Sequence, residues 1–396
     1  MRGDYESALK WLAQAQEGRT ALGDIAGLAQ VLIQTGVVWL RKGEYDQARQ
    51  LFNEGLAMAR EGDDKSGTAL ALNDLGIVAD KRGDYAAAVA LYEESLALRR
   101  EMGERRGIAT SLHNLGNVAH AQGNYAQARA LYEESLVLQG EMGDKNGAAL
   151  SLHDLGFAAM EQGDHPVARR MYEEGLALHR EMGNKPGIAL LLNGLGVLAQ
   201  RQGDYAAARV LYEDSLALHR ELGDKANVAV SMLNLGIVFW YQSDPVTAWK
   251  LWEESLVLSR ELGHKEYMAL CSFALGLTHL AARQGAPGEV EEARLQLTTS
   301  LRLHQERGAQ FRLTSSLVGM AVLAIHEGDA RRSANLLGAI EAALQALHVP
   351  MEPVIVPFHK ETLAAVREQL GELAFQSAWE EGSHWSLDEA VKRALE

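Results

Sequence analysis

The sequence predicts an all-α solenoid of antiparallel helix pairs. Glycine recurs at every fortieth position, at Gly36, Gly76, Gly116, Gly156, Gly196, Gly236 and Gly276. Alanine and leucine keep the same register, at Ala48, Ala88, Ala128, Ala168, Ala208 and Ala248, and at Leu56, Leu96, Leu136, Leu176, Leu216 and Leu256. Only 7 of the 396 residues are proline, so little opposes helix formation. A fixed period of this length is typical of stacked supersecondary units.

Each unit is predicted to contain two helices joined by a tight turn. In residues 66–101, apolar residues follow helical spacing on one face of the first helix, up to Gly83. Gly83 is expected to end that helix, and Asp84 to cap the second helix, which carries Ala88, Tyr92 and Leu96. A glycine in a helix interior costs about 1 kcal/mol relative to alanine. Its recurrence therefore indicates close approach of the partner helix.

Eight helix pairs are predicted, beginning near residues 26, 66, 106, 146, 186, 226, 266 and 309. A lone helix is expected before them, because Tyr5 and Ala8 match the second helix of a unit whose first helix is missing. Such a start suggests a piece of a longer protein. The solenoid is assigned to residues 1–347. A proline-containing link and a small helical cap, with helices near 358–370, 371–381 and 386–395, are assigned to residues 348–396.

The repeat resembles the tetratricopeptide repeat family. The matching residues are Leu75-Gly76, the turn Gly83-Asp84-Tyr85, Ala88 and the aromatic Tyr92. The resemblance covers about residues 4 to 345 and implies a right-handed superhelix. The usual unit of the family has about 34 residues. The six additional residues are expected to lengthen the second helix and the link between units.

The end of the chain carries a second resemblance. The residues are Leu336-Leu337-Gly338-Ala339, Leu370-Gly371, Phe375, Ala378-Trp379, Glu381-Gly382, Ser386-Leu387 and Glu389-Ala390. They resemble the end of large bacterial signal-transduction ATPases, which are similar to LuxR-like and MalT-like regulators. That resemblance implies a sensor or interaction region of a larger protein. Neither the ATPase nor the effector module lies in this sequence.

Charge and composition limit the classes of partner. The formal net charge is -15, which repels a phosphate backbone and an anionic membrane surface. We therefore expect no direct nucleic-acid or membrane partner. The only cysteine, Cys271, lies in an apolar stretch of a predicted first helix, and no signal peptide is visible. A cytoplasmic location is the expectation.

The sequence lacks the motifs of common catalytic sites. It contains no Gly-Lys dipeptide of a P-loop, no His-Glu-x-x-His helix and no Gly-x-Ser-x-Gly elbow. We expect neither catalysis nor a cofactor. A three-histidine metal site at His113, His120 and His153 is conceivable, but no carboxylate is arranged as an obvious support. Polar lining of a groove is the preferred interpretation of these histidines.

In the tetratricopeptide family the first helices line the concave groove, so residues that vary there are candidates for ligand binding. By register they are Asn73, Asp74, His113, Asn114, Asn117, His120, His153, Asp154, Phe157, Asn193, Gln200, Arg201, Asn234, Trp240, Tyr241 and Phe273. They are polar toward the N-terminus and aromatic toward the C-terminus. An extended peptide with a polar end and an apolar end fits this gradient.

Two features have alternative explanations. The aromatic residues Trp240, Tyr241, Trp249, Trp252, Tyr267 and Phe273 form either a ligand anchor or a core thickening on which the C-terminal tail docks. A row of cations recurs once per link, at Lys65, Arg105, Lys145, Lys185, Lys225 and Lys265. It either binds an acidic partner or complements helix ends and the glutamate-rich surface, which is the preferred interpretation.

Three functions are considered. The first is a non-catalytic sensor or interaction domain of a larger bacterial signalling ATPase or transcription regulator. The second is a free-standing adaptor that binds an extended peptide in the groove. The third is a sensor of a small-molecule inducer. End-to-end self-association is a further expectation, since the exposed ends of a solenoid can stack.

Overall fold

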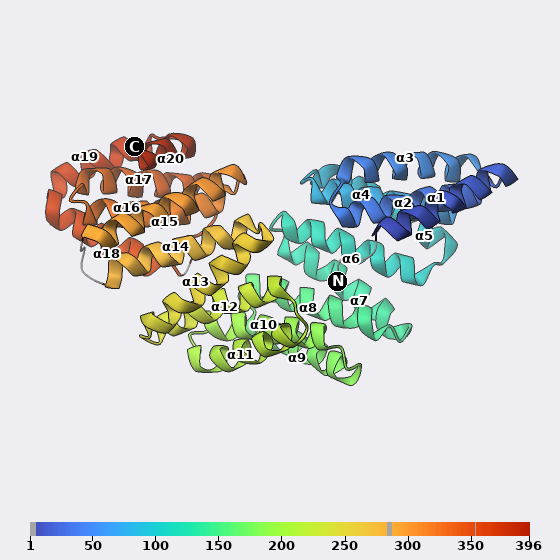
Figure 1. Cartoon of the computed structure of the whole chain (residues 1–396), viewed down its shortest axis with the longest axis horizontal. Coiled ribbons are helices and arrows are strands. Elements are labelled where there is room, and N and C mark those ends of the chain that lie inside the picture. Colours follow the sequence, from blue (N-terminus) through green and yellow to red (C-terminus); the bar gives the residue numbers. More distant parts are fainter. Residues whose placement is uncertain (1–4, 283–286, 353) are drawn as a thin grey trace. The chain divides into compact units, whose positions relative to one another are not determined.

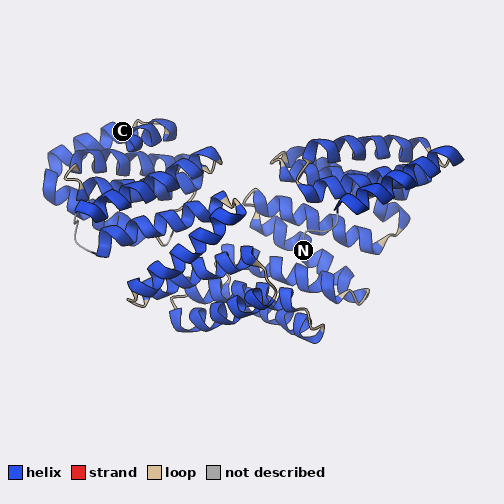
Figure 2. Ribbon diagram, in the orientation of Figure 1, coloured by secondary structure: helices blue, strands red, loops and turns tan. Residues whose placement is uncertain are grey.

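The computed structural model describes residues 5–282, 287–352 and 354–396, and all regular structure in these ranges is helical (Figure 2). The first helices of the eight pairs are α2 (Ile25–Lys42), α4 (Lys65–Lys81), α6 (Arg105–Ala121), α8 (Lys145–Glu161), α10 (Lys185–Arg201), α12 (Lys225–Tyr241), α14 (Lys265–Ala282) and α16 (Gln310–His326). The second helices are α3 (Tyr45–Glu61), α5 (Tyr85–Met102), α7 (Tyr125–Glu141), α9 (His165–Glu181), α11 (Tyr205–Glu221), α13 (Pro245–Leu262), α15 (Pro287–Glu306) and α17 (Ala330–Leu347).

Four helices lie outside the pairs. The lone helix α1 (Tyr5–Leu22) precedes them, and α18 (Val356–Leu370), α19 (Glu372–Ser383) and α20 (Leu387–Leu395) follow them. The all-α fold class is confirmed, and each first helix begins within one residue of the predicted position. The expected lengthening of the link is wrong. Both helices of a pair have 17 or 18 residues in most units, and α5 and α6 are separated only by Gly103 and Glu104.

The turns follow from their residues. Gly83 has a φ of 77°, in the left-handed region where glycine is favoured. The Asp84 carboxylate accepts a hydrogen bond from the backbone N–H of Ala87 (3.1 Å) and so caps α5. Pro166 and Pro245 stand in the first turns of α9 and α13, where no backbone donor is lost.

Six of the seven recurrent helix glycines face an aromatic ring of the partner helix, and Gly276 faces Leu297. A Cβ added at Gly116 would lie 2.5 Å from Tyr132 Cε1, and one at Gly236 would overlap Trp252 Nε1. The side chains of Tyr132 and Trp252 are 2% and 3% exposed. The glycines therefore let the two helices of a pair approach closely enough to bury the ring, as their recurrence predicts.

The chain divides into two compact units. Unit 1 comprises residues 1–194 and unit 2 residues 195–396, with the division inside α10. Within unit 1, α2 contacts α4 and α4 contacts α6; within unit 2, α12 contacts α14 and α14 contacts α16. Successive second helices stand further apart and are bridged by ion pairs such as Arg60–Glu94 (2.6 Å). The first helices therefore form the inner face of each unit. Figure 1 labels the helices along the chain.

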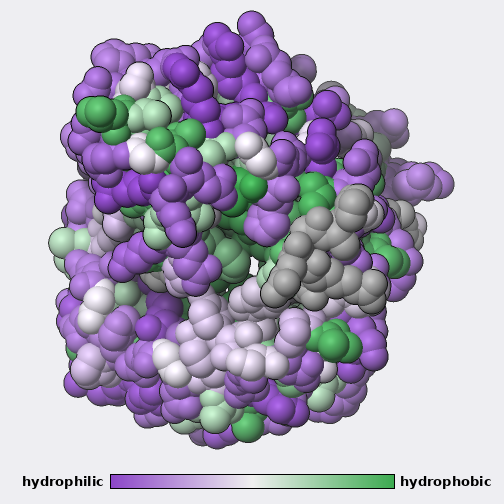
Figure 3. All heavy atoms as spheres, turned by 90° about the vertical axis from the view of Figure 1, so that its left-hand side faces the viewer, coloured by the Kyte–Doolittle hydropathy of each residue, from purple (hydrophilic) through white to green (hydrophobic). Residues whose placement is uncertain are grey.

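The last three helices pack on the last pair of unit 2. Helix α19 lies along α17, and α18 and α20 contact both α16 and α17. A shared core buries Leu317, Ile340, Val366, Phe375 and Val391. The surface of this end is mostly hydrophilic, with small scattered hydrophobic patches (Figure 3). In the described part of the chain, no helix combines the length and apolar character needed to span a bilayer.

Candidate functional site

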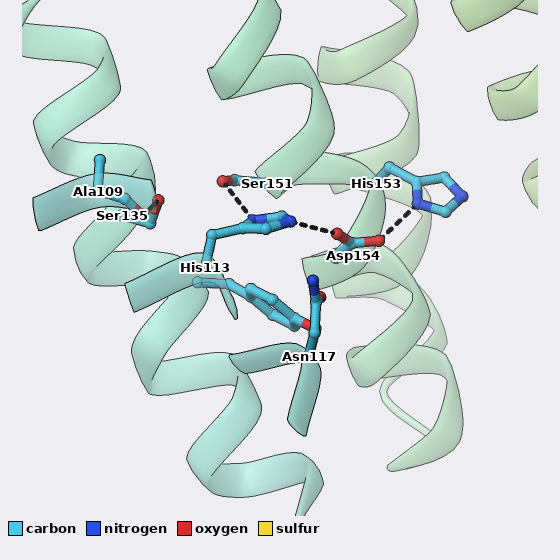
Figure 4. A network of polar contacts seen from close by, with 8 residues as sticks. Ala109, His113, Asn117, Ser135, Ser151, His153 and Asp154 are labelled. Atoms are coloured by element: carbon cyan, nitrogen blue, oxygen red, sulfur yellow. Dashed lines mark hydrogen bonds and ion pairs between the residues drawn. The ribbon is translucent and has the colours of Figure 1, made fainter. Parts of the chain in front are cut away.

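A histidine–aspartate network lies on the inner face of unit 1. Asp154 on α8 accepts contacts from two sides, with His113 Nε2 on α6 at 3.2 Å from its Oδ2 and His153 Nδ1 at 2.8 Å from its Oδ1 (Figure 4). The other ring nitrogen of His113, Nδ1, lies 3.4 Å from the Ser151 hydroxyl oxygen. The ring of His113 also packs on Tyr132, with centroids 5.3 Å apart. The network therefore fixes His113 between two successive helix pairs of unit 1.

The charge of Asp154 is maintained by these contacts. Burial alone would raise its pKa, but the hydrogen bonds from His113 and His153 more than offset burial and hold the pKa at about 2. The side chain of Asp154 is 22% exposed, as is that of His153. A partner that reaches the inner face therefore meets an ionised carboxylate beside an imidazole.

A second polar chain joins α4 to α6. The Asn114 side-chain amide donates to Asn73 Oδ1 (3.0 Å), and the Asn73 amide donates to Asp74 Oδ1 (3.2 Å). Burial raises the pKa of Asp74 to about 6, against the opposing effects of the Asn73 hydrogen bond and the charge of Arg99. Asn114 is half-buried, and within the described residues its side-chain oxygen accepts no hydrogen bond. That oxygen is an open acceptor on the inner face.

Asn117 and His120 complete the inner face of α6. The hydroxyl of the buried Tyr132 donates to Asn117 Oδ1 (2.8 Å), so Asn117 partly serves the core. The ring of His120 lies between Phe157 and Tyr125, at centroid distances of 4.9 and 5.3 Å. Burial lowers the pKa of His120, which favours its neutral form. His120 therefore does not join His113 and His153 around Asp154.

The other polar candidates occupy helices α10 and α12. Asn193, Gln200 and Asn234 are half-buried, and Arg201 is exposed. Gln200 accepts a hydrogen bond from the hydroxyl of the buried Tyr212 (3.0 Å), much as Asn117 does from Tyr132. Gln200 and Asn117 thus satisfy core tyrosines as well as facing inward.

The aromatic candidates lie against the protein itself. In unit 2, the ring of Trp240 is 6.1 Å from that of Trp252 and 6.4 Å from that of Phe358 in α18. Tyr241 stacks on Tyr205 at 4.8 Å, and its hydroxyl donates to the Val354 carbonyl (3.4 Å). These contacts favour the tail-docking alternative for Trp240 and Tyr241.

In unit 2, Cys271 lies in the interior and Phe273 is half-buried against the neighbouring first helix. Phe273 on α14 packs against Gly319 of α16, where an added Cβ would lie 3.0 Å from its ring. Cys271 is fully buried, and burial raises the pKa of its thiol to about 12. A protonated buried thiol is a poor nucleophile.

Sequence reasoning missed the part that serine plays in the network. Ser151, which contacts His113, has counterparts Ser111 and Ser231 one and two repeats away, all at most 1% exposed. A second serine register, Ser95, Ser135 and Ser255, donates to the carbonyls of Ala69, Ala109 and Ala229. Both registers follow the same period as the glycines, so they are recognisable from the sequence.

Five of the six cations in the row form ion pairs within their own helix pairs. The partner is a glutamate at the end of the second helix: Glu101 for Lys65 (2.6 Å), Glu181 for Lys145 (2.5 Å), Glu261 for Lys225 (3.0 Å), Glu306 for Lys265 (2.8 Å) and Glu141 for Arg105. These pairs match the preferred interpretation, in which the cations complement the glutamate-rich surface. Among the described residues, no cluster of three or more histidine, cysteine or acidic side chains is arranged to hold a metal ion.

Comparison with known proteins adds a family and a set of related folds. A model described as tetratricopeptide repeat matches residues 1–61, 60–101, 107–181 and 187–248. No protein of curated function matches the sequence. The apo form of the quorum sensor NprR from B. thuringiensis is 13% identical, with a TM-score of 0.64, and the match covers 87% of this chain and 98% of that one.

A second solved structure is similar over nearly the whole chain. It is the Rap conjugation gene regulator of the plasmid pLS20 in complex with the Phr* peptide. It is 14% identical, with a TM-score of 0.57, and the match covers 91% of this chain and 97% of that one. At such identities the two likenesses show the fold.

Proposed function

Because the chain belongs to the tetratricopeptide repeat family, we propose that it is a non-catalytic scaffold that binds an extended peptide on the inner face of unit 1. The observation that carries this proposal is the row of polar side chains across α4, α6 and α8. Asn73, Asn114, His113, Asp154 and His153 link three successive first helices through hydrogen bonds. Such a row runs across the helices, in the direction that an extended chain would take.

The chemistry of this row suits a peptide backbone. The open side-chain oxygen of Asn114 accepts a peptide N–H, while the ionised Asp154 and the imidazole of His153 offer an acceptor and a second polar contact. The rigid packing of His113 between Tyr132 and Asp154 preorganises the face, which reduces the entropic cost of binding.

The related structures support a peptide partner. One is a Rap regulator in complex with the Phr* peptide, and another is the quorum sensor NprR. We extend peptide binding to this chain as part of the proposal. Residues 336–390 resemble signal-transduction ATPases, and on this ground the proposal includes a role as the cytoplasmic sensor domain of a larger bacterial signalling ATPase or transcription regulator. A free-standing peptide adaptor is the alternative.

A small-molecule inducer is the less favoured ligand. Two cavities, of about 380 and 830 Å³, are lined largely by second helices, α5 and α7 in unit 1 and α13 and α15 in unit 2. Small-molecule sites are enclosed and mostly apolar. The polar inner face of unit 1 has a different character, better suited to a chain with many backbone donors and acceptors.

The test compares two asparagines on opposite sides of unit 1. Peptides selected from a random library on the full chain are titrated against Asn114→Ala and against the matched variant Asn53→Ala, at an exposed position of α3. Loss of one or two hydrogen bonds predicts about five- to tenfold weaker binding for Asn114→Ala and none for Asn53→Ala. Equal affinity of both variants, with unchanged circular dichroism, would move the site off the inner face.

A further inference from the structure

The start of the C-terminal tail is anchored on the inner face of unit 2. Glu352 forms an ion pair with Arg312 of α16, and the Ser315 hydroxyl, also on α16, donates to Glu352 Oε2 (2.7 Å). The side chain of Glu352 is 16% exposed, so the carboxylate is largely enclosed by its partners. This anchor ties the tail to the first helix of the last pair.

Two contacts then join the tail to α12. The Val354 carbonyl accepts a hydrogen bond from the Tyr241 hydroxyl (3.4 Å), and the Phe358 ring lies 6.4 Å from the Trp240 ring. Between them, Ile355 is 1% exposed. Helices α12 and α16 are separated by α14, with which both are in contact. The tail therefore crosses the first helices of unit 2, on the face that corresponds to the peptide site proposed for unit 1.

The rest of the tail is held by other contacts. Helix α19 packs on α17, where an added Cβ at Gly338 would overlap the Trp379 backbone. Phe375 and Val391 are buried in the core that α16 and α17 share with the cap. Helices α19 and α20 therefore have contacts with α16 and α17 that do not involve the Glu352–Arg312 ion pair or the Tyr241–Val354 hydrogen bond.

We propose that the tail segment, which carries Glu352, Val354, Ile355 and Phe358, competes within the chain for the inner face of unit 2. When the segment is docked, a partner peptide cannot bind to α12, and a bound peptide excludes the segment. The proposal rests on the proposed function, since it assumes that an inner face is a peptide site. It makes Trp240 and Tyr241 part of a covered site that opens when the segment is displaced. The inner face of unit 1 is then available to a peptide at all times, whereas the inner face of unit 2 binds a peptide only after the tail segment is displaced.

Charge reversal at the anchor tests the cover. In the full chain, Glu352→Lys places a cation beside Arg312, while Glu361→Lys makes the same change at an exposed position of α18. The Ile355 amide donates to the Glu352 carbonyl (3.1 Å), so its hydrogen exchange reports docking. We expect exchange at least tenfold faster in Glu352→Lys and unchanged in Glu361→Lys. The double variant Arg312→Glu/Glu352→Lys should restore slow exchange, and equally fast exchange in it would contradict the anchor.

A synthetic peptide tests the competition. The probe is a labelled peptide of residues 348–359, added to each full-length variant. Glu352→Lys should bind it at least tenfold more tightly than the wild type or Glu361→Lys, and the addition of Trp240→Ala should abolish that binding. Equal affinity for wild type and Glu352→Lys, or binding by neither, would overturn the proposal. Because this probe does not involve Asn114, its failure is distinguishable from failure of the peptide site in unit 1.

Discussion

At the residue scale, the repeated glycine is a steric requirement. At Gly116 the nearest atom to an added Cβ is Tyr132 Cε1, in a ring whose hydroxyl is committed to Asn117. The ring cannot move away without losing that hydrogen bond or its place in the core. Replacing this glycine by alanine would stabilise the helix itself by about 1 kcal/mol, which partly offsets the cost of the clash.

We predict that Gly116→Ala lowers the free energy of unfolding by up to about 2 kcal/mol, because overpacking of about 1–3 kcal/mol outweighs the helix preference of about 1 kcal/mol. Gly140→Ala on α7 is the matched control, since nothing lies within 4 Å of an added Cβ there. It should raise stability by about 0.5–1 kcal/mol. Urea unfolding of both variants measures the difference, and a stabilised Gly116→Ala would contradict the packing described.

Two aspartates of the inner face respond to pH in opposite directions. The pKa of Asp154 is held at about 2, so its contribution to stability is present above about pH 4 and is lost as the pH falls toward 2. The pKa of Asp74 is raised from 3.8 to about 6. The folded state thus favours protonated Asp74. The stability that the protonated carboxyl contributes is fully present below about pH 4 and is lost as the pH rises through 6.

Asp74→Asn should therefore change stability in a pH-dependent way. A shift of about two pKa units corresponds to about 2–3 kcal/mol. We expect the variant to gain up to that amount over the wild type between pH 4 and pH 7, because it lacks the cost of ionising a buried carboxyl. Urea midpoints of both proteins at the two pH values measure this gain. An equal difference at pH 4 and pH 7 would mean that Asp74 does not carry the raised pKa.

At the element scale, the turns between helices depend on the left-handed conformation. Most turns place glycine there, as at Gly163 and Gly203, both with a φ of 78°. Ser243 occupies the equivalent position between α12 and α13 with a φ of 62°, and Asp63 does so between α3 and α4 with a φ of 51°. A side chain in this region costs about 1–2 kcal/mol.

Ser243→Gly should therefore stabilise the protein, and Gly203→Ser should destabilise it. The net effect of each is about 0.5–1 kcal/mol, because glycine also increases the entropy of the unfolded chain. Thermal unfolding of the two single variants is the measurement. Changes of the same sign in both would contradict the assignment of strain to Ser243.

The helices were largely predictable from the sequence, whereas the site was predictable only in part. Helix ends follow from local chemistry such as Gly83 and Asp84, and repetition averages out errors, so boundaries agree within one or two residues. The pairing of His113 with Asp154 depends on how one helix pair stacks on the next. The period of the sequence does not specify that stacking. The contact of Trp240 with Phe358 joins positions far apart in the sequence and has no counterpart in the repeat.

At the scale of the whole molecule, the net charge is -15. Some of the charged surface residues form ion pairs. The cations of the links are neutralised by glutamates of the same helix pairs, with both partners about half exposed. Such surface pairs add little stability individually. Because these cations are already neutralised, the charged and polar groups of the inner face are the ones in unit 1 that remain to recognise a partner.

The two units differ in what covers the inner face. In unit 1 the side chains of His153, Asp154 and Asn114 are partly accessible, whereas in unit 2 the tail contacts Trp240 and Tyr241. Under the proposal, one chain therefore carries an available peptide site and a covered one.

Site-specific photo-cross-linking tests the proposed peptide site in unit 1 most directly. A photoreactive amino acid replaces either Asn117 on the inner face of α6 or Asn53 on the outer surface of α3, and each protein is irradiated with a library-selected peptide. We predict cross-links from position 117 and none from position 53. Cross-links from position 53 alone would show that the peptide binds outside the inner face and would contradict the account.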